Sequence, residues 1–285
     1  MKTIRTAKIY VTDVSDYVYC PRLFFMKKTM DIPRVETLAM HKGTIEHEIR
    51  RSAVKSIKAE YEACKDPYAL KTIDYQSCIK GAIEYGLELA RKIKSMYYLR
   101  LEEMTPTLQY RLEIEEKARL DDAIKMAKKG HSIREIIQAL LPWKQEIGVG
   151  SSELGVTGRI DELYKIGKKL IPLDFKTHSN RFNAFMWKES HQEQLKLYST
   201  LLEMDYPGYK SDSAIIELTE DLHKEKFKVT RKDKANVKKH IQQIKDLIRI
   251  GEIPPKLSGP KAVKCSACYM RRVCFPIDKE GEQNC

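Results

Sequence analysis

The sequence predicts an α/β protein with a mixed central sheet flanked by helices and interrupted by a long helical insertion. Helical patterns run almost without interruption up to residue 141, and three strand patterns follow in hairpin succession from residue 143. A helix, two strands and a second helix then complete the order to residue 251. The hydrophobic fraction of 42% and the charged fraction of 32% are those of an ordinary globular protein.

The chain carries a formal net charge of +12 and an isoelectric point near 9.2. Lysine and arginine gain affinity for polyanions by displacing condensed counterions, which favours a nucleic acid as partner. On charge alone, a solvated basic surface is equally compatible. No apolar run approaches the roughly 20 residues needed to span a bilayer, and "MKTIRTAKIYVTDVSDY" has no apolar signal-peptide core. We therefore expect a cytoplasmic protein without a membrane partner.

Residues 1–50 form the expected N-terminal segment, with a short strand in "AKIYV" and a helix that starts near Thr12. Pro21 restricts Cys20 to an extended conformation, so Cys20 should lie at a helix end. Residues 51–141 form the helical insertion, because apolar residues recur at helical spacing in each of its segments. Such an insertion should lie beside the core and shape a cleft.

The core is expected over residues 142–252, followed by a loop-rich tail over residues 253–285. "WKQEIGVGSSELGVTGRIDELYKIGKKLIPLDFKT" alternates as three strands, with turn residues at 150–152 and 167–169. Later in the core, "RKDKANVKKHIQQIKDLIR" forms a basic helix. Its lysines are the cations that we expect to meet DNA phosphates, although a solvated amphipathic face has the same pattern.

The strand "LIPLDFKT" places a carboxylate and an ammonium on one side, because Asp174 and Lys176 are two residues apart. Asp161 lies on the preceding strand and can approach the same site, whereas Glu162 should face the other side. Two converging carboxylates suit Mg²⁺ or Mn²⁺, and Lys176 can orient an attacking water or stabilise charge on a phosphate. Taken alone, these residues also fit a surface hairpin with a cross-strand ion pair.

"GRIDELY" and "LIPLDFKT" together resemble the core of the PD-(D/E)xK nuclease superfamily, in its RecB-like branch. In that branch an Asp at the end of the second core strand precedes a (D/E)-x-K on the third. A helix bearing Q-x-x-x-Y follows, and Gln194 and Tyr198 match it as an i, i+4 pair on one helix face. Gly43 and His47 match the early G-x-x-x-H of the branch, although His47 alone would be an ordinary solvated residue.

The resemblance implies a metal-ligand set of three side chains and one backbone carbonyl oxygen: His47, Asp161, Asp174 and Phe175. Lys176 would position or activate the water. Gln194 would hold the active-site architecture or the DNA backbone, and Tyr198 would lie near the scissile strand. Glu146, on the first core strand, is a weaker candidate for a nearby role.

Three cysteines in "KCSACYMRRVC" follow a C-x2-C-x5-C spacing: Cys265, Cys268 and Cys274. Four others could complete a four-coordinate site: Cys20, Cys64, Cys78 and Cys285. We choose Cys20, because a thiolate beside Pro21 at a helix end can point away from the helix axis. Seven cysteines without a secretory signal argue against a disulfide framework. Spacing alone does not separate zinc from an iron–sulfur cluster.

Iron–sulfur members of the RecB-like branch carry one upstream cysteine in a Tyr-x-Cys-Pro-Arg context and three downstream cysteines with this same spacing. "YVYCPR" matches the upstream context. The resemblance therefore implies a 4Fe–4S cluster that fastens the N-terminal segment to the C-terminal tail.

Among these members, a short stand-alone chain most resembles the CRISPR-associated exonucleases of the spacer-acquisition module, or their archaeal paralogues. That resemblance implies a Mn²⁺- or Mg²⁺-dependent exonuclease that cuts single-stranded DNA and trims spacer precursors beside the CRISPR integrase. The long insertion departs from the compact members of the family. A free-standing DNA repair nuclease would use the same chemistry. A DNA-binding adaptor with a vestigial site is a third hypothesis, but the complete set of site residues argues against it.

Overall fold

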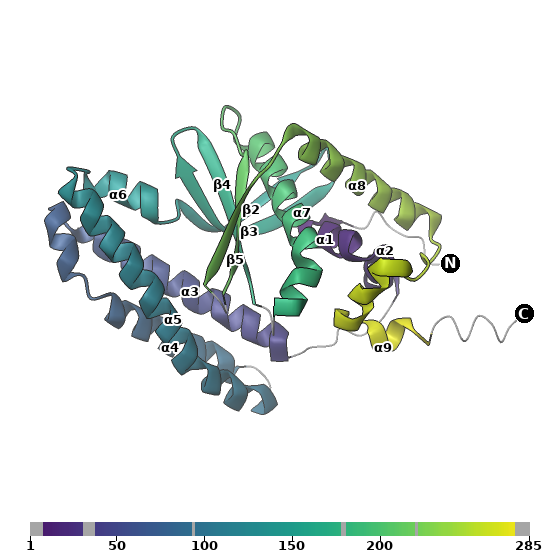
Figure 1. Cartoon of the computed structure of the whole chain (residues 1–285), viewed down its shortest axis with the longest axis horizontal. Helices are drawn as coiled ribbons and strands as arrows, with labels where there is room; N and C mark the ends of the chain where they lie inside the picture. Colours follow the sequence, from purple (N-terminus) through teal and green to yellow (C-terminus); the bar gives the residue numbers. More distant parts are fainter. Residues whose placement is uncertain (1–7, 31–37, 93–94, 178–180, 220–221, 277–285) are drawn as a thin grey trace, which may run out of the picture.

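The computed structural model describes residues 8–30, 38–92, 95–177, 181–219 and 222–276. A mixed sheet lies at the centre with helices packed around it, which confirms the predicted α/β fold (Figure 1). The described strands are β1 (Ile9–Tyr10), β2 (Lys144–Ser151), β3 (Val156–Ile166), β4 (Lys169–Lys176), β5 (Ser213–Leu218) and β6 (His223–Lys228). They are ordered β1-β3-β4-β5-β6, with β2 paired to β3.

The three predicted hairpin strands are β2, β3 and β4, and both of their connections are antiparallel. The parallel pair β4–β5 is joined by the long helix α7 (Arg181–Asp205), as a parallel connection requires. The main core lies between the sheet and helices α1 (Val11–Tyr19), α7 and α8 (Arg231–Ile250). Leu195 and Leu201 of α7 and Ile244 of α8 are completely buried there.

The N-terminal segment has a shorter strand than predicted. Helix α1 begins at Val11, because the Asp13 carboxylate accepts a hydrogen bond from the Tyr10 backbone N–H at 2.8 Å and caps the helix start. Cys20 separates α1 from α2 (Pro21–Thr29) in an extended conformation, with φ −161° and ψ 117°. The predicted effect of Pro21 on Cys20 is therefore confirmed.

The helical insertion is confirmed as helical and consists of α3 (Leu38–Ala63), η1 (Pro67–Thr72), α4 (Tyr75–Arg91), α5 (Ser95–Lys128) and α6 (Ile133–Leu140). Its helices bury two apolar clusters of their own. Helices α3 and α4 pack closely, because a Cβ atom at Gly86 would lie 2.2 Å from Ile49. Helix α3 runs continuously across the expected boundary at residue 50, and the division of the chain into four domains stays a prediction.

The sheet forks between β3 and β4. Their pairing runs from Ile166 opposite Lys169 to Glu162 opposite Leu173, whereas β4 stays paired with β5 as far as Lys176. From Asp174 onward, β4 therefore follows β5 and leaves β3. We call this place the fork. Within the described residues, no helix combines the length and the apolar character that crossing a bilayer requires.

Candidate active site

Asp161 lies at the fork and points from β3 toward β4. Its Oδ2 accepts a hydrogen bond from the Phe175 backbone N–H at 2.8 Å, in place of a ladder bond between the two strands. Ile160 and Leu163 both enter the same core cluster, although residues three apart on a regular strand face opposite sides. Strand β3 is therefore irregular between them, and this irregularity turns the Asp161 carboxylate toward the edge of β4.

Strand β2 is irregular at the position opposite Asp161. Gln145 pairs with Glu162 and Ile147 pairs with Ile160, but Glu146 between them has φ 50°. A residue other than glycine in this left-handed region costs roughly 1–3 kcal/mol, and such strain clusters at functional sites. The distorted residue is thus also the one whose carboxylate reaches the fork, Glu146.

His47, Glu146 and Asp161 present one ligand atom each within 4.8 Å of one another. The part of the chain that the structure describes holds no other group of three such donors as close. His47 comes from α3, and its Nδ1 lies 3.7 Å from Asp161 Oδ1. Burial lowers the pKa of His47, so its imidazole is neutral, which is the form that binds metals. One imidazole and two carboxylates fit a divalent cation.

Asp174 and Lys176 lie together on β4, the strand that leaves β3 at the fork, as predicted. Asp174 Oδ2 is 2.7 Å from the Lys176 ammonium, and its Oδ1 accepts a hydrogen bond from Gln194 at 2.9 Å. The Gln194 side-chain oxygen in turn accepts from Lys176 at 3.1 Å. Burial, and then the charge of Asp174, raise the pKa of Asp161 well above its usual value. A cation between these carboxylates would relieve both penalties.

Two further predicted residues, Tyr198 and Gly43, lie next to the site. Tyr198 is 2% exposed, and its hydroxyl donates to the Arg159 carbonyl oxygen at 2.5 Å, two residues before Asp161. A Cβ atom at Gly158 would lie 2.8 Å from the Tyr198 ring, so only glycine fits beside it. Gly43 faces the site from α3, because a Cβ atom there would lie 4.0 Å from Thr177 Oγ1.

Glu162 faces away from the fork, as expected. It accepts hydrogen bonds from the Tyr164 hydroxyl at 2.9 Å and from Gln145 at 3.1 Å, on the side of the insertion. The structure thus gathers the predicted His47, Asp161 and their partners, and adds Glu146 to the closest group of donors. The register of the β2–β3 hairpin could have indicated this, because it places Glu146 opposite Asp161.

One family model matches this chain from residue 11 to residue 275, and its description is the PD-(D/E)XK nuclease superfamily. The chain belongs to the PD-(D/E)XK nuclease superfamily. The match includes strands β3 and β4 on both sides of the fork and helix α3, and so every residue of the candidate active site. Membership implies a metal-dependent nuclease with a nucleic acid as substrate, and the donors at the fork fit that expectation. No curated protein is similar enough to the chain to match it.

The four cysteines predicted as cluster ligands line one pocket between α2 and the C-terminal segment: Cys20, Cys265, Cys268 and Cys274. Burial raises the pKa of the Cys20 thiol and raises that of Cys268 to about 11. No three of these sulfur atoms lie within 4.8 Å of one another, so the described residues form no compact thiolate site. Cys64 and Cys78 pack in an apolar cluster of the insertion, and Cys285 lies outside the described residues.

Proposed function

We propose that this superfamily member is a metal-dependent exonuclease that hydrolyses single-stranded DNA. One observation carries the proposal: the fork brings together three metal donors with a carboxylate–lysine–glutamine group, namely His47, Glu146, Asp161, Asp174, Lys176 and Gln194. The net charge of +12 supports a polyanionic substrate.

His47, Glu146 and Asp161 would hold a Mn²⁺ or Mg²⁺ ion, with Asp174 and the Phe175 carbonyl oxygen as further ligands. When bound, such an ion polarises a phosphoryl oxygen and lowers the pKa of a bound water. Gln194 and Lys176 would act directly on the substrate or on the attacking water, because hydrogen bonds hold their side chains in place. Gln194 bonds to both Asp174 and Lys176, so the Lys176 ammonium is held where it can orient the attacking water or stabilise charge on the phosphate.

The test compares cleavage of an end-labelled single DNA strand with Mn²⁺ by the wild type, Asp174→Asn and Lys176→Ala. We expect each variant to lose at least about 100-fold in rate, since each removes a group aimed at the reacting phosphate. Lys169→Ala, at the exposed start of the same strand, is the matched control and should cleave normally. Full activity in Lys176→Ala would sink the catalytic assignment, and cuts within the strand rather than from its ends would sink the exonuclease assignment.

We also propose a 4Fe–4S cluster on Cys20, Cys265, Cys268 and Cys274. Their shared pocket supports it, as does their C-x2-C-x5-C spacing along the sequence. A structural zinc site on the same four cysteines is the alternative.

The cluster proposal predicts a brown protein whose visible absorption disappears in Cys20→Ser and Cys268→Ser. Cys78→Ser, which removes a cysteine of the insertion, should keep the colour. A colourless wild type with stoichiometric zinc would replace the cluster with a structural zinc site.

The proposed biological role is the trimming of spacer precursors beside a CRISPR integrase. The support is the sequence pattern "YVYCPR" with C-x2-C-x5-C, in combination with the candidate nuclease site. Co-purification of an integrase with the tagged full chain would test this role. A free-standing repair nuclease would cleave DNA identically but recover no integrase.

A further inference from the structure

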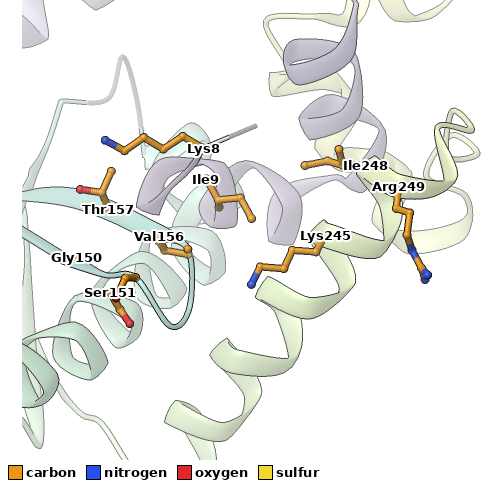
Figure 2. A pocket seen from close by; sticks show the side chains of 11 residues that line it. Lys8, Ile9, Gly150, Ser151, Val156, Thr157, Lys245, Ile248 and Arg249 are labelled. Atoms are coloured by element: carbon orange, nitrogen blue, oxygen red, sulfur yellow. The ribbon is translucent and has the colours of Figure 1, made fainter. Parts of the chain in front are cut away.

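A hollow of about 990 Å³ lies at the N-terminal end of β3, between the β2–β3 hairpin, β1 and the C-terminal half of α8 (Figure 2). The fork lies further along, near the middle of β3. Its floor is apolar and consists of Ile9, Val156 and Ile248. None of the residues assigned to the candidate active site or to the cysteine pocket lines it. The hollow is therefore a separate feature of the surface from both of these sites.

The charged residues that line this hollow are all cations: Lys8, Lys245 and Arg249. Arg249 is paired with Asp246 at 2.9 Å. Lys8 and Lys245 form no ion pair with any carboxylate that the structure describes. Figure 2 shows the Lys245 side chain extending from α8 toward the hairpin and the Lys8 side chain lying above Thr157. Two ammonium groups that no described carboxylate neutralises therefore flank an apolar floor, and that of Lys8 lies 5.8 Å from the centre of the Tyr10 ring.

The hairpin wall of the hollow is built from small residues: Gly150, Ser151, Ser152, Gly155 and Thr157. Gly155 has φ +67°, and a Cβ atom there would lie 3.8 Å from the Lys245 ammonium. The turn therefore lies in contact range of the Lys245 ammonium, and its positive φ favours glycine. Next to the hollow, Tyr10 is paired with Thr157 and is 47% exposed, with the Lys28 ammonium 5.0 Å from its ring centre.

Strand β3 connects the hollow directly to the fork. Asp161 is four positions after Thr157, which corresponds to about 13 Å along a strand. Arg159 lies between them, and its side chain is 72% exposed. A polyanion that fills the hollow can therefore continue along β3, past Arg159, to the carboxylates. The stacked B-form spacing of roughly 3.4 Å per nucleotide sets an upper limit of about four nucleotides for this distance, and a more extended single strand spans it with fewer.

We propose that this hollow binds the backbone of the single DNA strand a few nucleotides away from the phosphodiester bond that is cut. Lys8 and Lys245 bind phosphates, while sugars and unpaired bases lie on the apolar floor, which a duplex with inward-facing bases would not cover. An exposed aromatic ring among cations, as at Tyr10, is typical of single-strand binding surfaces. The inference rests on the proposed nuclease function, because it names where that enzyme holds its substrate.

The experiment measures binding of a labelled 20-nucleotide DNA strand by fluorescence anisotropy without divalent metal, so that no cleavage occurs. Lys8→Gln/Lys245→Gln should weaken binding about three- to tenfold and lower the slope of log K against log salt by about 1.4, or 0.7 for each lost phosphate contact. The matched control is Lys71→Gln/Lys80→Gln, which removes two exposed lysines of the helical insertion, away from the hollow and from the basic helix α8. The control should bind like the wild type, and both proteins should keep the wild-type melting temperature.

Binding of Lys8→Gln/Lys245→Gln that equals the wild type, or a loss no larger than in the control, would overturn the proposal. So would a wild type that binds no single strand at low salt. A second measurement adds cleavage: the variant should cut the 20-nucleotide strand more slowly but a dinucleotide, whose single phosphodiester bond leaves nothing to reach the hollow, at the normal rate. The binding assay needs no catalysis. Its result can therefore be interpreted even if the cleavage test shows that the protein is not a nuclease.

Discussion

Glu146 holds a left-handed backbone conformation in the middle of β2, with φ 50°. Its carboxylate is one of the three donors grouped within 4.8 Å, and Arg159 lies 3.4 Å from it on the outer side. The surrounding hairpin maintains the conformation through pairs on both sides, Gln145 with Glu162 and Ile147 with Ile160. The fold thus maintains a strained backbone at the position of one candidate metal-binding carboxylate.

Comparing Glu146→Gly with Glu146→Ala separates this backbone strain from the carboxylate. Both variants lose the side chain, but only glycine adopts a positive φ freely, so Glu146→Gly should be about 1 kcal/mol more stable than Glu146→Ala. Urea denaturation measures the difference, and calorimetric Mn²⁺ titration should show weakened binding in both variants. Equal stability of the two would show that the backbone at this position carries no strain, and wild-type Mn²⁺ affinity would remove Glu146 from the ligand set.

The residues of the fork were predicted unequally well. Alternation along β4 was enough to place Asp174 and Lys176 on one side, because it depends only on local strand geometry. Glu146 ranked low, because its contribution depends on a backbone angle and on a partner on another strand. The proposed cysteine ligands were predicted from a sequence pattern at both ends of the chain. In the described structure, no three of their sulfur atoms lie within 4.8 Å of one another.

At the scale of elements, a buried ionic network joins the insertion to the sheet. Arg50 of α3 is 2% exposed and donates to Glu115 of α5 at 2.8 Å and to Glu217 of β5 at 3.3 Å. Its guanidinium also lies 5.2 Å from the centre of the Phe175 ring. Since His47 is one turn earlier on α3, the network fixes the helix that delivers this metal donor.

Arg50→Ala should destabilise the protein by about 3–5 kcal/mol, because it removes a buried guanidinium from Glu115 and Glu217 and leaves them with Lys224 as the cation they share. Arg51→Ala, the neighbouring residue with an exposed pair to Glu48, is the control and should cost less than about 1 kcal/mol. Chemical denaturation of the two variants provides the comparison. A loss below about 1 kcal/mol in Arg50→Ala would mean that the network does not hold α3 in place.

Hairpin strands and insertion helices could be predicted because periodicity is local. The Arg50 network could not, since its partners lie 65 and 167 residues away along the chain. The same limit applies to the boundary at residue 50: continuous helical periodicity runs through it, and α3 belongs both to the candidate site, through His47, and to the insertion. Sequence patterns therefore identify helices and strands better than they locate the boundaries between domains.

At the scale of the whole molecule, the two ends of the described chain meet beside the sheet. Helices α2 and α9 (Arg271–Cys274) lie next to each other (Figure 1). The Tyr19 hydroxyl donates to the Lys264 carbonyl oxygen, and Arg22 donates to the Pro254 carbonyl oxygen at 3.0 Å. Tyr19 also stacks on Trp187 of α7, with ring centres 3.7 Å apart. This junction therefore touches the helix that carries Gln194.

Among the described residues after Pro254, Met270 is the only buried apolar side chain, and Leu257, Ala267 and Val273 are partly buried beside it, so a cluster would add stability to the junction. If the proposed cluster supplies it, Cys268→Ser should make the segment from Lys256 to Arg272 the first site of trypsin cleavage, while the nuclease core persists as a large fragment. Time-resolved digestion followed by mass spectrometry measures the order of cuts, with Cys78→Ser as the control that should digest like the wild type. Identical digestion of Cys268→Ser and the wild type would show that hydrogen bonds and stacking close the junction without the cluster.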